Sequence, residues 1–125
     1  MKKTLAGATI AAVLMLAGCS STPSQAEACK TLDAQATEVM GAFSEISADD
    51  VDGSTAALEK AKDVVEEMAA VEGPAEFEEL RNSLTVAMAS FITEAQAAIA
   101  GEPGDMLDVE AGVTDATSDL IAYCG

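Results

Sequence analysis

The chain has 125 residues, of which 22 are acidic, six are basic and none is histidine, so its formal net charge is −16. Such an acidic surface repels nucleic acid and anionic lipid headgroups, which excludes phosphate-driven binding as a main function. Because the chain has no histidine, it cannot form a Ser-His-Asp or Cys-His nucleophile system, and it cannot form a zinc site with histidine ligands. We therefore expect no enzyme and no cofactor.

The first 18 residues have the features of an export signal. Lys2 and Lys3 form a short basic segment, and the uncharged residues 5–16 are rich in Leu, Ile, Val, Met and Ala. This stretch is shorter than the roughly 20 apolar residues that a transmembrane helix needs. Residues 1–18 are therefore predicted to be a signal peptide rather than a membrane span.

The end of this segment, Leu16-Ala17-Gly18-Cys19, has small residues before a cysteine. It resembles the lipobox of bacterial lipoproteins. The resemblance implies cleavage between Gly18 and Cys19 and a diacylglyceryl group on the Cys19 thiol, a stable anchor because it carries two acyl chains. The domain would then face the extracytoplasmic side of the cell membrane. The alternative is an ordinary secretory signal with an incidental cysteine.

Residues 19–28 are predicted to be the lipidated cysteine and a flexible tether, since Ser, Thr, Pro and Gln dominate this stretch. Loss of the signal peptide removes Lys2 and Lys3, so four basic residues remain against 22 acidic ones and the mature net charge is −18. Residues 29–125 have the length of one small domain, for which we recognise no family.

Two cysteines remain after lipidation of the first, Cys29 and Cys124. Export places them in an oxidising compartment, where a leftover pair in a small domain usually forms a disulfide. Free thiols for redox chemistry or metal binding are the weaker alternative, because the two cysteines lack Cys-x-x-Cys spacing. We predict a disulfide between Cys29 and Cys124.

Apolar residues recur at steps of three and four along the whole domain, which predicts helices and no strands. The four stripes contain Cys29, Leu32, Ala36, Val39, Phe43 and Ile46; Leu58, Ala61, Val65, Met68 and Val71; Phe77, Leu80, Leu84, Met88, Phe91, Ala95 and Ile99; and Met106, Val109, Val113, Ala116, Leu120 and Tyr123.

Turn residues separate the stripes: an acidic turn before Ser54, which is the expected N-cap of the second helix, then Gly73-Pro74, and then a turn around Pro103. Short connections make neighbouring helices antiparallel, so the prediction is an all-α, up-down-up-down four-helix bundle closed by one disulfide. Four helices place Cys29 and Cys124 at the same end of the bundle. Three would place them at opposite ends, beyond the reach of a disulfide.

One weak metal candidate is present, because Asp50, Asp52 and Glu59 resemble part of an EF-hand calcium loop. The register is broken, since the first ligand position would be Ala48. An ordinary acidic turn is the preferred interpretation, with no metal.

Residues 82–101 contain a single charge, Glu94, within a highly charged domain. Central packing of the third helix explains this if the helix is buried on nearly every side. The alternative is an exposed strip of Thr85, Ala89, Thr93 and Gln96, bordered by Val86 and Ile92, that receives a partner.

Two function hypotheses follow from these observations. In the first, the protein is a non-catalytic binding or interaction module that contacts another protein of the cell envelope; a phage-encoded lipoprotein that blocks superinfection is one version. In the second, it carries a small apolar ligand in a cavity of roughly 300 Å³ or more between the helices. The first is preferred here, because an alanine-rich bundle closed by a disulfide is expected to have little room inside.

Overall fold

The computed structural model describes residues 23–102 and 104–125, and within them the chain is all-helical. The helices are α2 (Gln25–Phe43), α3 (Val51–Met68), α4 (Ala75–Ile99) and α5 (Met106–Cys124). The predicted helical class and the four helices are thereby confirmed for this part of the chain, where the sole β-type pairing is an isolated bridge between Ser47 and Asp50. The predicted signal peptide and Cys19 lie outside the described residues.

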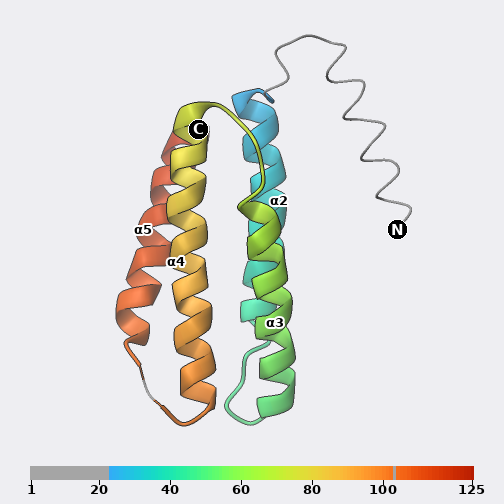
Figure 1. Ribbon diagram of the computed structural model, residues 1–125, viewed down its shortest axis with the longest axis vertical. Coiled ribbons are helices and arrows are strands. Elements are labelled where there is room, and N and C mark those ends of the chain that lie inside the picture. The colour runs from blue at the N-terminus through green and yellow to red at the C-terminus, as the bar shows by residue number, and fades with distance from the viewer. Residues whose placement is uncertain (1–22, 103) are drawn as a thin grey trace, which may run out of the picture.

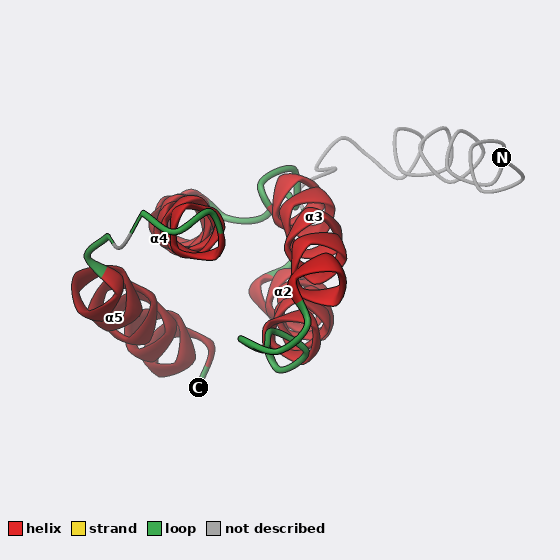
Figure 2. Cartoon of the chain, turned by 90° about the horizontal axis from the view of Figure 1, so that it is seen from below, coloured by secondary structure: helices red, strands yellow, loops and turns green. Residues whose placement is uncertain are grey.

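Each helix packs on the next one along the chain: α2 on α3, α3 on α4 and α4 on α5. The α2–α3 and α4–α5 connections lie at one end of the molecule and the α3–α4 connection lies at the other (Figure 1). Seen along the helices, α4 lies between α5 on one side and the α2–α3 pair on the other (Figure 2). Helix α2 makes only small contacts with α4 and α5.

Helix α2 begins earlier than the sequence suggested. Ser24 is its N-cap, and the Ser24 hydroxyl accepts a hydrogen bond from the Glu27 N–H at 3.2 Å. Ala28 is buried in the first turn. Residues 25–28, which were expected to belong to the tether, are therefore part of the folded domain.

The predicted N-cap of α3 is wrong. Asp50 caps this helix, because its carboxylate accepts a hydrogen bond from the Gly53 N–H at 2.9 Å. Ser54 is instead buried one turn later. Its hydroxyl accepts from the Ser47 N–H at 2.8 Å and donates to the Ser47 carbonyl at 2.9 Å, which fastens the α2–α3 loop to α3.

The core is built by α2, α3 and α4. The largest fully buried apolar side chains are Phe77, Leu32, Leu58, Met68, Leu84, Met88 and Val39. Helix α5 contributes one buried residue, Ala116, and its other stripe residues are only partly covered. Since burial of apolar surface is the main stabilising term in folding, α5 is the helix that packing holds least.

A disulfide compensates for this at one end of α5. The Sγ atoms of Cys29 and Cys124 lie 1.97 Å apart, with their Cα atoms 6.0 Å apart, so the predicted pair is found at bonding distance. Beside it, the Gln25 side-chain amide donates a hydrogen bond to the Tyr123 carbonyl at 2.7 Å. The start of α2 and the end of α5 are therefore joined.

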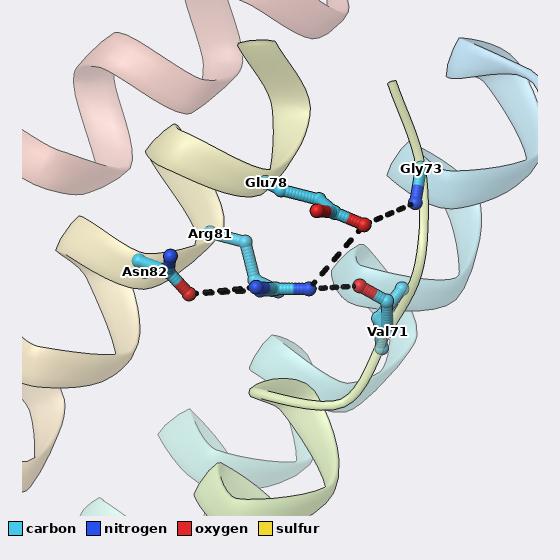
Figure 3. A network of polar contacts seen from close by, with 5 residues as sticks. All are labelled: Val71, Gly73, Glu78, Arg81 and Asn82. Atoms are coloured by element: carbon cyan, nitrogen blue, oxygen red, sulfur yellow. Dashed lines mark hydrogen bonds and ion pairs between the residues drawn. The ribbon is translucent and has the colours of Figure 1, made fainter. Parts of the chain in front are cut away.

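The α3–α4 loop is held by α4 through polar contacts (Figure 3). The Arg81 guanidinium donates to the Val71 carbonyl and, at 2.7 Å, to Asn82 Oδ1. Glu78 Oε2 accepts from the Gly73 N–H at 3.3 Å and lies 4.0 Å from Arg81 Nη1. The ion pair is partly buried but lies at the long end of the range for such contacts, so the bonds to loop backbone matter most.

Gly73 occupies a position where a side chain does not fit. A Cβ atom there would lie 2.6 Å from Cδ1 of Phe77 and 2.8 Å from Cβ of Ala28. Both neighbours are buried in the core. The glycine thus lets the loop backbone pass between α2 and α4.

We predict that Gly73→Ala lowers the free energy of unfolding by about 1–3 kcal/mol through overpacking. Gly41→Ala is the matched control, because nothing lies within 4 Å of a Cβ at this exposed helical position; it should stabilise the protein by roughly 0.5–1 kcal/mol. Denaturant unfolding measures both variants. Equal effects of the two substitutions would contradict the assigned close approach.

We predict that replacing Cys29 and Cys124 together by serine lowers the free energy of unfolding by about 3–5 kcal/mol, since the bond closes a loop across 95 residues. Amide hydrogen exchange should increase most in α5, whose packing is weakest. An unfolding midpoint that does not respond to reductant would contradict this prediction.

Candidate functional site in the groove between helices α2 and α5

An apolar groove of about 530 Å³ begins beside the disulfide and runs between α2 and α5, with α4 beneath it. Leu84 and Met88 of α4 form its floor and are almost fully buried. The walls are formed mainly by aliphatic side chains, namely Leu32, Ala36 and Met40 of α2 and Leu120 and Ile121 of α5. The expectation that the bundle has little room inside is therefore wrong.

The groove continues toward the other end of the molecule. Met40 also lines a neighbouring hollow of about 460 Å³, and Phe43 and Phe91 separate that hollow from a third one of about 470 Å³. The centroids of these two rings lie 4.6 Å apart, which makes them the main bridge between α2 and α4 at this level. The second hollow thus continues the groove between α2 and α5, and the third lies mainly between the α2–α3 loop and α4.

Part of the exposed apolar surface borders these hollows, although Leu107 (79%) and Val86 (66%) lie elsewhere. The described residues include five large hydrophobic side chains that are mostly exposed, and three of them border the hollows: Met40 (52%), Val51 (52%) and Ile121 (65%). Contiguous exposed apolar surface indicates a binding site more strongly than scattered residues do. The α2–α5 groove is therefore the best candidate site in the described part of the chain.

The groove has few polar side chains. At its disulfide end, the exposed residues Lys30 and Asp33 line the rim from α2, one turn apart, and the half-buried Thr117 lines the groove further along, from α5. This arrangement of an apolar interior with a few polar groups at the mouth is typical of sites that bind small ligands. It provides binding and orientation for a ligand with a polar end.

Sequence reasoning did not identify this site. Leu32, Ala36, Leu84, Met88 and Leu120 were assigned only to helix stripes that pack in the core. Met40 and Ile121, the most exposed apolar residues of the rim, stand beside those stripes. Because of these two residues, the apolar surfaces of the first and last helices are wider than one stripe. That extra width is the sequence signal that part of each apolar face is left uncovered by neighbouring helices.

The predicted partner strip on α4 is only partly exposed. Ala89, Thr93 and Gln96 lie at the surface, but Thr85 is 6% exposed and Ile92 is also buried. Thr85 must be removed from the strip, because α4 packs on neighbours at two sides and its buried surface is wider than one stripe. The Thr85 hydroxyl donates to the Asn82 carbonyl at 3.1 Å.

What remains of the strip borders a shallow hollow of about 320 Å³ around Val86, Ala89 and Thr93. Glu94, the one charge of residues 82–101, also has a structural role. Its carboxylate accepts a hydrogen bond from the Asp105 N–H at 3.0 Å, which positions the start of α5. Packing between α3 and α5 accounts for the lack of charge only on the buried side of α4, because Ala89, Thr93 and Gln96 are exposed and uncharged.

The calcium candidates do not form a site. Asp50 caps α3 through its carboxylate, while Asp52 and Glu59 lie within that helix, seven positions apart. Across residues 23–102 and 104–125, no three His, Cys, Asp or Glu side chains are grouped closely enough to hold a metal ion. The acidic turn serves to begin a helix.

An exposed acidic pair lies at the start of α5. The pKa of Asp108 is raised, mainly by a side-chain hydrogen bond with Asp105 and next by the repulsion between the two carboxylates. Desolvation is the smallest of the three causes. Asp108 and Asp105 are both exposed. The pair lies at the opposite end of α5 from the disulfide and does not line the groove described above.

Comparison with known proteins gives no relative: no family model, no curated protein and no solved structure matches this chain.

We predict that Ala36→Trp weakens binding of a neutral apolar fluorophore, N-phenyl-1-naphthylamine, by at least about tenfold, a loss of roughly 1.4 kcal/mol, because the indole fills the groove. Fluorescence titration of a chain that begins at Ser20 measures this. Ala89→Trp, on the outer surface of α4, is the matched control and should bind as the parent does. Equal affinities in both variants would show that the fluorophore binds elsewhere.

Proposed function

We propose that this protein is a bacterial lipoprotein of the cell envelope, a non-catalytic binding module that holds a small apolar ligand between α2 and α5. In this proposal the up-down-up-down bundle stands outside the cytoplasmic membrane and the lipid on Cys19 anchors it. The groove of about 530 Å³ carries the proposal. Its volume lies within the roughly 300–1,000 Å³ typical of ligand sites.

The chemistry of the lining supports binding rather than catalysis. Aliphatic side chains dominate the lining, the charged residues Lys30 and Asp33 are exposed, and Thr117 is the one uncharged polar side chain that lines the space. Such a lining stabilises an apolar ligand by removing its surface from water, at about 25 cal/mol per Å². The proposed ligand is therefore recognised through its apolar part.

The sequence before the domain supports the lipid anchor. The basic segment, the apolar stretch and Leu16-Ala17-Gly18-Cys19 occur in the order found in bacterial lipoproteins. Among the described helices, none has the length and apolarity needed to cross a membrane. Five residues, 20–24, lie between Cys19 and the first residue of α2. At about 3.6 Å per residue, this tether spans at most about 20 Å.

Contact with a protein partner through α4 is the second candidate. Val86, Ala89 and Thr93 form its shallow hollow, and Val86 is 66% exposed. This surface is smaller than the groove, and burial of Thr85 and Ile92 interrupts the expected strip. The geometry therefore favours the groove, and the α4 contact stays a prediction.

We predict that Cys19→Ala abolishes both lipid attachment and retention in the membrane fraction, because Cys19 carries the proposed anchor. Metabolic labelling with a clickable palmitate analogue, followed by fractionation, measures both. The double serine variant of Cys29 and Cys124 is the control and should keep its label. A label that persists on the Cys19→Ala protein would rule out lipidation at this residue.

A further inference from the structure

The width of the groove limits what can enter it. At its disulfide end the backbones of α2 and α5 approach closely, with the Cα atoms of Cys29 and Cys124 only 6.0 Å apart. An α-helix with its side chains is about 10 Å across and does not fit between them. The hollow nevertheless extends along both cysteines and onward between the helices. At this end of the groove a single flexible chain fits, whereas a partner helix does not.

The length and lining suit an acyl chain. From Ala26 to Met40 the groove follows 14 residues of α2, or about 21 Å at a rise of about 1.5 Å per residue. Leu84 and Met88, one turn apart on α4, form an apolar floor beneath part of this length. A long, narrow, aliphatic groove of about 530 Å³ accommodates one extended hydrocarbon chain.

The charges at the mouth favour a particular headgroup. Lys30 and Asp33 lie on the rim at the disulfide end, both exposed and opposite in sign. A zwitterionic head can place its phosphate near the ammonium of Lys30 and its own ammonium near the carboxylate of Asp33. An anionic head lacks the second contact, and the mature charge of −18 repels it.

We propose that the groove binds one single-chain zwitterionic phospholipid, a lysophosphatidylethanolamine, with its acyl chain over Leu84 and Met88 and its head between Lys30 and Asp33. This inference rests on the proposed function and names its ligand. The source is the membrane to which the protein is anchored. Because α2 begins within about 20 Å of Cys19 along the chain, the mouth of the groove stays close to the lipid headgroups.

The test uses the lipidated full-length protein in phosphatidylcholine vesicles that contain a lysophosphatidylethanolamine with a photoreactive diazirine in its chain. After irradiation, mass spectrometry locates the crosslinks. They are expected on peptides of α2, α4 and α5 that contain Leu32, Met88 and Ile121. Crosslinks confined to other surfaces, or none, would overturn the proposal.

Three comparisons complete the experiment. Ala36→Trp should reduce crosslinking by about tenfold, as 1.4 kcal/mol of lost affinity does, while Ala89→Trp should leave it unchanged. Met40→Arg, at a 52% exposed position whose change leaves the core intact, should also reduce it. A photoreactive phosphatidylglycerol lysolipid should crosslink less than the ethanolamine lipid. Equal yields for the two tryptophan variants, or for the two headgroups, would overturn the proposal.

A last arm separates the free lipid from the protein's own anchor. Here the photoreactive chain is incorporated metabolically on Cys19 and no free probe is added. Crosslinks from that chain into the groove would overturn the assignment to a membrane lipid; their absence, with crosslinks from the free probe, supports it. Fluorophore binding that is lost in Ala36→Trp while no lysolipid crosslinks would leave the proposed function standing and remove only this ligand.

Discussion

The bond between Cys29 and Cys124 is the constraint on which the arrangement of this domain depends. It joins the start of α2 to the end of α5, and these two helices otherwise make only small contacts. The Gln25–Tyr123 hydrogen bond lies at the same end. The disulfide therefore holds α2 and α5 together at one end of the bundle. From there the two helices diverge, and no continuous packed interface joins them.

Packing explains why the groove stays open. The larger core residues lie among α2, α3 and α4, and α5 adds only Ala116 to the buried set. Ala36 and Thr117 face the space between α2 and α5 with side chains too small to fill it. At the level of Phe43 and Phe91 the paired rings close the distance between α2 and α4, which separates the second hollow from the third.

Much of the architecture was predictable from the sequence, because helical periodicity and turn residues are local signals. The apolar stripes that begin at Cys29 and Phe77 correctly predicted α2 and α4. The two cysteines left after the predicted lipidation correctly predicted the Cys29–Cys124 pair. Ser54 was misassigned because an aspartate and a serine in one acidic turn are both good N-caps, and the choice depends on the buried contact of Ser54 with Ser47.

The groove was not predictable for a different reason. Periodicity identifies the side of α5 that turns inward, but it does not give the distance at which α5 stands from α2. The sequence left both a buried and an exposed Thr85 open, because its burial follows from the central place of α4, which has neighbours on two sides. Both properties are set by tertiary packing, and neither leaves a distinct pattern in the sequence.

The central claim is that α2 and α5 enclose a site that accepts an apolar ligand, and methionine methyl groups report on it most directly. Met40 and Met88 line the groove, whereas Met68 is fully buried and does not line it. In a protein labelled at its methionine methyl groups, addition of the neutral apolar fluorophore N-phenyl-1-naphthylamine should shift the NMR signals of Met40 and Met88 and leave that of Met68 in place. Signals that do not move, or that move equally for all three residues, would contradict the account.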